Sequence, residues 1–192
     1  MRYTKEQLNF EDGLKKEWLI TNGIGGYASS SIMGINTRKY HGLLVAALTP
    51  PARRSVILSK VDEAIRINGT DIPIYSNIGK DYVTKGYKYL EGFEKKYIPI
   101  FTYKVKGILI KKMICMEYGK NTVTILYIVE NIGYPTTLVL TPVMNFRDFH
   151  TTTFNKTFDL QEQINENKVK VIVDKKLDLE EKDKIEEKES IQ

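Results

Sequence analysis

The sequence predicts an all-β protein, a large antiparallel two-sheet β-sandwich with a charged C-terminal tail. Three observations lead to this prediction. β-Branched and aromatic residues dominate successive runs of five to eleven residues between Pro99 and Phe146. Turn residues separate these runs every eight to fifteen positions. No convincing helical period appears before residue 174.

The N-terminal part combines polar segments with glycine. Residues 1–16 are polar and mixed, and Asp12-Gly13 predicts a short strand or a turn there. Four glycines fall within residues 23–34, and the loop from Asn22 to Gly26 is predicted to be a tight turn because glycine adopts backbone angles closed to other residues. The run from Thr37 to Leu48 is predicted as a strand whose apolar half is buried on both faces in the centre of a sheet.

A hairpin and a meander follow. The Asn68-Gly69 pair lies between two runs of alternating apolar residues, which is the strongest short hairpin signal in the chain. Residues 76–92 are rich in glycine, lysine and tyrosine and predict a loop or weak strands. From Pro99 onwards four strands are predicted in sequence, and residues 168–173 look like one more strand.

The last 19 residues, 174–192, contain 13 charged side chains. They are predicted to be a solvated, partly ordered or helical tail. Eight of these residues are acidic and five are basic, so the tail carries −3. Because the net charge of the whole chain is +5, residues 1–173 carry +8. A basic body can attract nucleic acid, but the lysines are spread along the predicted strands rather than clustered, so no nucleic-acid partner is expected.

Length and composition restrict the class of protein. With 192 residues, 42% of them hydrophobic and 28% charged, the chain suits one domain with a proper core. The single Cys115 rules out a disulfide within one chain and fits a reducing, cytoplasmic location. The N-terminus has no apolar run, and no segment approaches the ~18 apolar residues of a membrane span, so no membrane partner is expected.

The glycine loop does not fit a phosphate-binding motif. Asn22-Gly23-Ile24-Gly25-Gly26 contains G-x-G, but a phosphate loop also needs Lys-Ser/Thr after the glycines and a helix behind them. Here Tyr27 and a run of small residues with strand-like spacing follow. The loop is therefore interpreted as a tight turn or as a place where backbone approaches a partner closely.

Polar residues begin the strand predicted from Thr37. On a strand, Arg38 and Tyr40 would share one face, while Lys39 and His41 would share the other. One interpretation is a basic strand end with a satisfied histidine. The other is polar recognition, in which arginine donates to fixed acceptors, tyrosine stacks, and histidine donates or accepts.

A second polar group ends the longest apolar run. Arg147, Asp148 and His150 follow the predicted strand there, and adjacent Arg-Asp is often a local ion pair. A site shared by the two histidines, His41 and His150, suggests itself. As a zinc site it fails, because the chain has two histidines, one cysteine in a strand interior and no metal-type spacing.

No catalytic group stands out either. Ser29 to Ser31 lack a nucleophile elbow. Glycoside hydrolysis needs two acids held at a fixed separation, and Glu17, Asp62, Glu63 and Asp148 do not form a distinctive pair in the sequence. We therefore expect no catalytic residue, no metal and no cofactor in this chain.

The sequence nevertheless resembles a known family. The stretches EWLITNGIGGYAS, NTRKYHGLLVA and PPARRSVIL follow one another within residues 17–58. Together with YLEGFEKKYIPIFTY and the PVMNFRDFH end at residues 142–150, they closely resemble the start of the bacterial and archaeal type of glycogen debranching enzyme, the amylo-α-1,6-glucosidase family. The resemblance covers about residues 15–150, and many unusual positions match in order.

The resemblance implies a division of labour. In such hydrolases of α-1,6 branches, the N-terminal region is a large, supersandwich-like β-domain, and a helical toroid after it carries the catalytic carboxylates. The chain has no room for a toroid, so residues 1–173 are expected to be the non-catalytic N-terminal domain. Its expected partners are the toroid of the full-length protein and α-glucan. The expected interdomain or sugar-facing residues are Trp18, Asn22, Gly25, Gly26, Arg38, Tyr40, His41, Arg147, Asp148 and His150.

Other interpretations stay open. The domain is alternatively an independent glycogen-binding module with a platform of exposed tyrosines, or a basic domain that binds nucleic acid through the interleaved lysines and tyrosines of GYKYLEGFEKKY. Trp18 either stacks on a sugar or lies in the core. The charged tail departs from the family pattern, and a missing final strand would expose a sheet edge on which a homodimer can form.

Overall fold

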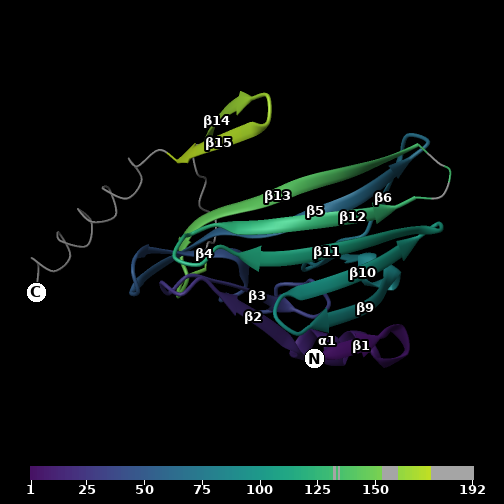
Figure 1. The fold of residues 1–192 in the computed structure, drawn as a ribbon, viewed down its shortest axis with the longest axis horizontal. Helices are drawn as coiled ribbons and strands as arrows, with labels where there is room; N and C mark the ends of the chain where they lie inside the picture. Colours follow the sequence, from purple (N-terminus) through teal and green to yellow (C-terminus); the bar gives the residue numbers. More distant parts are fainter. Residues whose placement is uncertain (132, 134, 153–159, 174–192) are drawn as a thin grey trace, which may run out of the picture. The chain divides into compact units, whose positions relative to one another are not determined.

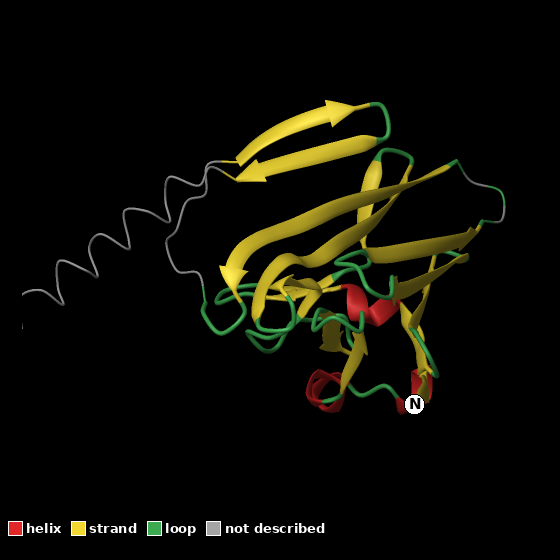
Figure 2. Cartoon of the chain, turned by 60° about the vertical axis from the view of Figure 1, so that its left-hand side comes forward, coloured by secondary structure: helices red, strands yellow, loops and turns green. Residues whose placement is uncertain are grey.

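The computed structural model describes residues 1–131, 133, 135–152 and 160–173. The described chain consists of antiparallel strands with one short α-helix, so the all-β, two-sheet prediction is confirmed (Figure 1). Figure 2 shows that helix contributes only short segments. The chain divides into two compact units, Met1–Thr152 and Thr153–Gln192, and each is described by itself.

The first sheet of the larger unit contains the predicted meander. Its strand order is β1 (Arg2–Thr4), β9 (Leu90–Lys95), β10 (Pro99–Val105), β11 (Ile108–Met116) and β12 (Val123–Glu130). Lys106 and Gly107 connect β10 to β11, and both have positive φ, 47° and 82°. Such angles at both central residues produce the tight turn whose twist matches that of the flanking strands.

The second sheet contains the stretch that resembles a family signature. Its order is β13 (Thr136–Asp148), β5 (Arg53–Ile67), β4 (Gly42–Thr49), β3 (Tyr27–Ser31) and β2 (Glu17–Thr21), and β6 (Thr70–Pro73) pairs with β5. The apolar half of the run from Thr37 to Leu48 was predicted to lie in the centre of a sheet. This prediction is confirmed, since that half belongs to β4, which lies between β5 and β3. The predicted hairpin is also confirmed, because Asn68 and Gly69 join β5 to β6 with φ of 49° and 78°.

Short elements complete the larger unit. β7 (Ser76–Ile78) and β8 (Val83–Lys85) pair with each other, in the region where a loop or weak strands were predicted. Two short 3-10 helices, η1 (Lys5–Gln7) and η2 (Gly86–Tyr89), are also present. The prediction of a strand or turn around Asp12-Gly13 is wrong, because α1 (Phe10–Lys15) forms there. The side chain of Asn9 caps α1 by accepting a hydrogen bond from the Asp12 N–H at 3.1 Å. A helix of six residues is too short to show a period in the sequence.

The second unit contains one described hairpin. β14 (Leu160–Asn165) pairs with β15 (Lys168–Val173), so the strand predicted at residues 168–173 is confirmed. The tail predicted at 174–192 lies outside the described residues. The extent of the predicted domain, 1–173, stays a prediction.

The core of the larger unit lies between its two sheets. Ile65 of β5 and Ile110 of β11 are fully buried, and both belong to one continuous apolar cluster. Trp18 of β2 belongs to the same cluster, with 2% of its surface exposed, and its ring meets the Phe101 ring edge-on at 6.3 Å. Trp18 therefore contributes to core packing and is not a platform for a sugar in solution.

A buried ion pair also links the sheets. Lys112 of β11 donates to Glu63 of β5 at 2.5 Å, and the Tyr127 hydroxyl of β12 donates to the same carboxylate oxygen at 2.7 Å. Glu63 and Lys112 are 3% and 8% exposed. Burial, and secondarily the charge of Glu63, raises the pKa of Tyr127, so this hydroxyl keeps its proton and remains a donor.

Replacing Lys112 alone should be costly. K112M leaves the Glu63 carboxylate buried without its cation, and we expect a loss of about 3–5 kcal/mol in the free energy of unfolding. The double variant E63Q/K112M should recover most of this loss, because the amide introduced at 63 is neutral and still accepts from Tyr127. Guanidinium denaturation followed by circular dichroism measures both. Equal destabilisation of the single and double variants would contradict the argument.

Candidate functional site

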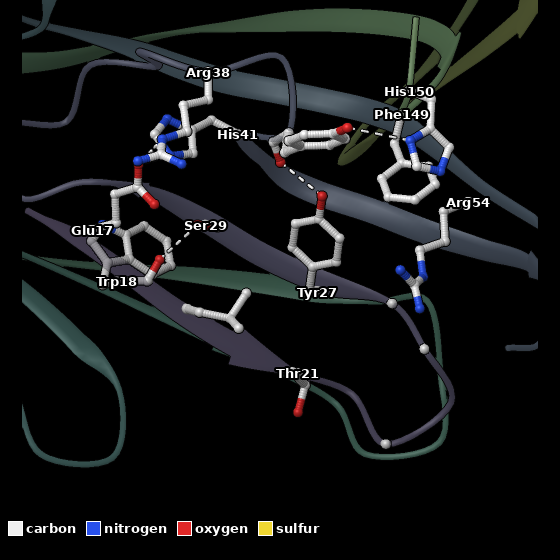
Figure 3. A pocket seen from close by; sticks show the side chains of 15 residues that line it. Glu17, Trp18, Thr21, Tyr27, Ser29, Arg38, His41, Arg54, Phe149 and His150 are labelled. Atoms are coloured by element: carbon white, nitrogen blue, oxygen red, sulfur yellow. Dashed lines mark hydrogen bonds and ion pairs between the residues drawn. The ribbon is translucent and has the colours of Figure 1, made fainter. Parts of the chain in front are cut away.

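A cleft of about 960 Å³ opens on the outer face of the second sheet (Figure 3). Side chains alternate between the two faces of β2, so Trp18 points into the core while the next residue, Leu19, lies on the opposite face and is 51% exposed. Leu19 therefore forms part of the floor of the cleft. The lining residues come from β2, β3, the glycine loop between them, the segment before β4, the start of β5 and the residues after β13. They are Glu17, Trp18, Leu19, Thr21, Gly23, Gly25, Gly26, Tyr27, Ser29, Arg38, Tyr40, His41, Arg54, Phe149 and His150.

The segment of residues 37–41 is a turn, so the strand predicted from Thr37 is wrong in its first half. The N–H of His41 donates to the Arg38 carbonyl at 3.0 Å, and the N–H of Thr37 donates to Nδ1 of His41 at 3.0 Å. These two bonds close the chain on itself, and β4 begins only at Gly42. The alternation of faces predicted for Arg38 to His41 therefore does not hold.

Glu17 forms the polar centre at one end of the cleft. Its Oε1 lies 2.5 Å from Nε of Arg38 and 3.3 Å from Nε2 of His41. Because Nδ1 of His41 accepts from Thr37, the neutral ring carries its proton on Nε2, facing the carboxylate. His41 is 3% exposed, and burial lowers its pKa, although the charge of Glu17 opposes this shift. The neutral ring therefore positions the turn and the carboxylate.

Aromatic rings form the other wall. The rings of Tyr40 and Phe149 have centroids 5.6 Å apart, and His150 meets Tyr40 edge-on at 5.8 Å. The Tyr40 hydroxyl lies 3.3 Å from Nδ1 of His150, and the Tyr27 hydroxyl donates to the Tyr40 carbonyl at 2.8 Å. Figure 3 shows Tyr27, Phe149 and His150 on the same side of the cleft. The wall is fixed by its own contacts before any ligand arrives.

Arg147 and Asp148 support this wall from behind. Nη1 of Arg147 donates to the Thr151 carbonyl at 2.7 Å, and Nη2 donates to the Lys39 carbonyl. The carboxylate of Asp148 accepts from the N–H of His150 at 2.8 Å. These bonds join the 37–41 turn to the end of β13. Both residues were predicted to contact a sugar or a partner domain, but neither is among the residues that line the cleft.

The glycine loop is held by Asn22, which is fully buried. Nδ2 of Asn22 donates to the Lys120 carbonyl at 2.9 Å, its Oδ1 accepts from the Ile24 N–H at 3.1 Å, and its own carbonyl accepts from the Gly119 N–H at 2.7 Å. The predicted tight turn is confirmed, since Gly25 has a φ of 100° and lies where an added Cβ would be 2.8 Å from the Pro51 carbonyl oxygen. Asn22 is therefore a structural residue that shapes the floor of the cleft.

The chemistry of the cleft favours binding over catalysis. Glu17 is the one carboxylate among the lining residues, and it is already paired with Arg38. A paired-acid glycosidase site needs a second carboxylate across the cleft. Among the described residues, no group of three or more histidine, cysteine or acidic side chains is placed to hold a metal ion. Searching the same residues finds no helix with the length and apolar character to cross a membrane.

Residue patterns identified part of this site. Seven of the ten candidates line the cleft: Trp18, Gly25, Gly26, Arg38, Tyr40, His41 and His150. Eight lining residues were not among the candidates, namely Glu17, Leu19, Thr21, Gly23, Tyr27, Ser29, Arg54 and Phe149. The stretches that resemble the family contain all eight, so their place within those stretches was the available signal.

Comparison with known families identifies the chain. Residues 16–183 match the family model described as Glycogen debranching enzyme N terminal. The chain belongs to this family. No curated protein and no solved structure gave a match. Every residue that lines the cleft lies within the matched range, so the cleft is built from the part of the chain that defines this debranching-enzyme N-terminal domain.

Removing the Asn22 side chain should destabilise the debranching-enzyme N-terminal domain. N22A leaves the Lys120 carbonyl and the Ile24 N–H without their buried partner, and we expect a loss of about 2–4 kcal/mol in the free energy of unfolding. K120A in the facing turn is the control, because it keeps the Lys120 carbonyl and removes only an exposed ion pair with Glu117. Urea denaturation compares the two, and similar losses for both variants would refute the structural role of Asn22.

The lowered pKa of His41 predicts a loss of stability in acid. The unfolded chain binds a proton to this histidine near pH 6.5, whereas the folded domain does so only at lower pH. Stability therefore falls as pH drops below about 6.5, by at most about 1.4 kcal/mol per pH unit for one proton. H41N keeps an acceptor for the Thr37 N–H and should flatten this dependence. Denaturation at pH 5, 6, 7 and 8 tests it, and parallel pH profiles for the wild type and H41N would contradict it.

Proposed function

We propose that the chain is the non-catalytic N-terminal domain of a glycogen debranching enzyme, which acts on the α-1,6 branches of glycogen. In this proposal the face that carries the cleft docks on the catalytic part and helps to shape the groove that receives the α-glucan. The observation that carries the proposal is the cleft itself, a preformed pocket with an aromatic wall whose one lining carboxylate is already ion-paired.

The construction of the cleft supports a binding role. Hydrogen bonds donated by Tyr27 and Arg147 and one accepted by the Asp148 carboxylate fix the aromatic wall, so little side-chain freedom is lost when a partner covers it. Aromatic rings with polar tips suit both a protein interface and the faces of sugars. Leu19, half exposed on the floor, adds apolar area that an interface would bury.

Independent glycogen binding has less support. The tyrosines considered for a platform do not act together, because Tyr82 and Tyr97 are 63% and 78% exposed, whereas Tyr87 stacks on Phe10 at 4.1 Å and is partly buried. Nucleic-acid binding through the segment GYKYLEGFEKKY has less support still. Part of this segment is β9, which pairs on both sides, and its Phe93 is 1% exposed in the core.

The docking role is tested by mixing the chain with a separately produced debranching-enzyme catalytic domain from the same organism. Isothermal titration calorimetry measures binding, and release of glucose from a branched limit dextrin measures activity. We expect a complex and a change in activity or thermal stability of the catalytic domain. Y40A should weaken the complex about tenfold or more, because it removes a central ring of the wall. Y97A, which removes an exposed ring outside the cleft, is the matched control.

Two results would overturn the proposal. One is the absence of both binding and any effect on activity or stability. The other is equal weakening by Y40A and Y97A, which would place the contact elsewhere. Affinity electrophoresis in glycogen gives a separate check, because migration of the chain alone that is retarded by glycogen and restored by Y97A would favour the independent module instead.

A further inference from the structure

Arg54 has no partner for its charge within the described part of the chain. It lies at the start of β5 on the wall of the cleft, and its guanidinium carbon is 5.2 Å from the centre of the Phe149 ring. Its Nε is buried and makes no hydrogen bond, and no carboxylate of a described residue lies within 4 Å of its charged atoms. A buried N–H without an acceptor is unfavourable, so this group is ready to receive one.

The other charges around the cleft are already engaged. Glu17 is shared by Arg38 and His41, and the carboxylate of Asp148 accepts from the backbone of His150. The guanidinium of Arg147 donates hydrogen bonds to backbone carbonyl groups. Once these groups are paired, Arg54 remains as the uncompensated positive charge among the residues that line the cleft.

The surroundings of Arg54 leave room for an incoming group. Figure 3 shows its guanidinium directed toward the glycine loop, where Gly23, Gly25 and Gly26 present backbone and no side chains. The Phe149 ring lies beside the guanidinium, with its centre 5.2 Å from the guanidinium carbon. A planar guanidinium can donate two parallel hydrogen bonds to a planar acceptor such as a carboxylate.

We propose that Arg54 binds a carboxylate side chain carried by a polypeptide segment of the catalytic part. This proposal rests on the docking role proposed above and names the chemistry of its contact. A neutral glucan would leave the charge of Arg54 uncompensated, whereas one carboxylate balances it and matches the planar guanidinium. The neighbouring apolar surface of Leu19, Tyr40 and Phe149 suits the apolar residues that flank an acidic side chain in a protein interface.

The first arm of the test measures the complex. R54Q removes the charge and keeps a polar side chain, and we expect it to weaken binding to the catalytic domain about tenfold or more, with a smaller dependence on salt than the wild type. R53Q is the matched control, because it removes the same charge from the neighbouring exposed residue, which does not line the cleft. Thermal unfolding of both variants verifies that they fold.

The second arm uses small probes on the chain alone. N-acetylglutamate amide, its glutamine counterpart, inorganic phosphate and maltotriose are titrated while NMR follows the Nε–H signal of Arg54. We expect the glutamate probe to shift this signal in the millimolar range and the glutamine probe and maltotriose to leave it unchanged. The shift is absent in R54Q and retained in R53Q.

Each outcome bears on one proposal. Binding of the catalytic domain that is equal for wild type and R54Q overturns the carboxylate contact and leaves docking intact. Absence of any complex, together with a shift by the glutamate probe, overturns docking and retains a carboxylate site. A shift caused by phosphate or maltotriose and not by the glutamate probe overturns the carboxylate proposal in favour of a phosphate or a glucan site.

Discussion

The hydrogen bonds of Asn22 and Asn121 hold the two sheets in register at the end where the cleft opens. Asn22 joins the loop after β2 to the turn that connects β11 to β12. From that same turn Asn121 reaches Ala47 of β4, donating to its carbonyl at 2.8 Å and accepting from its N–H at 2.9 Å. Both side chains replace backbone partners that strand pairing cannot supply at a sheet end. The floor of the cleft therefore depends on contacts made from the opposite sheet.

A second constraint acts in the interior. Glu63 and Lys112 face each other across the sandwich, and Tyr127 completes the group. A buried ion pair accepts one alignment of the two sheets, because an unpaired charge there is strongly unfavourable. The edge strand β2 can therefore serve two purposes. Trp18 packs against a core whose alignment is fixed, and the residues on either side of it face the cleft.

The elements that the sequence predicted correctly are those that depend on local periodicity and on turn residues. The hairpin at Asn68-Gly69 and the strands of the meander follow from alternation and from residues that accept positive φ. The turn at 37–41 was not predicted, because its geometry depends on a hydrogen bond between the His41 ring and the Thr37 backbone, which has no signature in the sequence. Arg54 is a harder case still, because the property that matters, a charge left without a partner, depends on every other residue around the cleft.

The arrangement of charges gives this face its polar character. An interface held by apolar contacts alone would need only side chains such as leucine and valine. Instead Glu17 neutralises Arg38 inside the cleft, while Arg54 on the opposite wall is left unneutralised. Paired charges in a rigid wall fix shape, and an unpaired one selects a partner, because a surface that cannot supply the opposite charge leaves a desolvated cation behind. In the proposed contact, specificity would therefore reside in the single arginine, and rigidity in the paired charges around it.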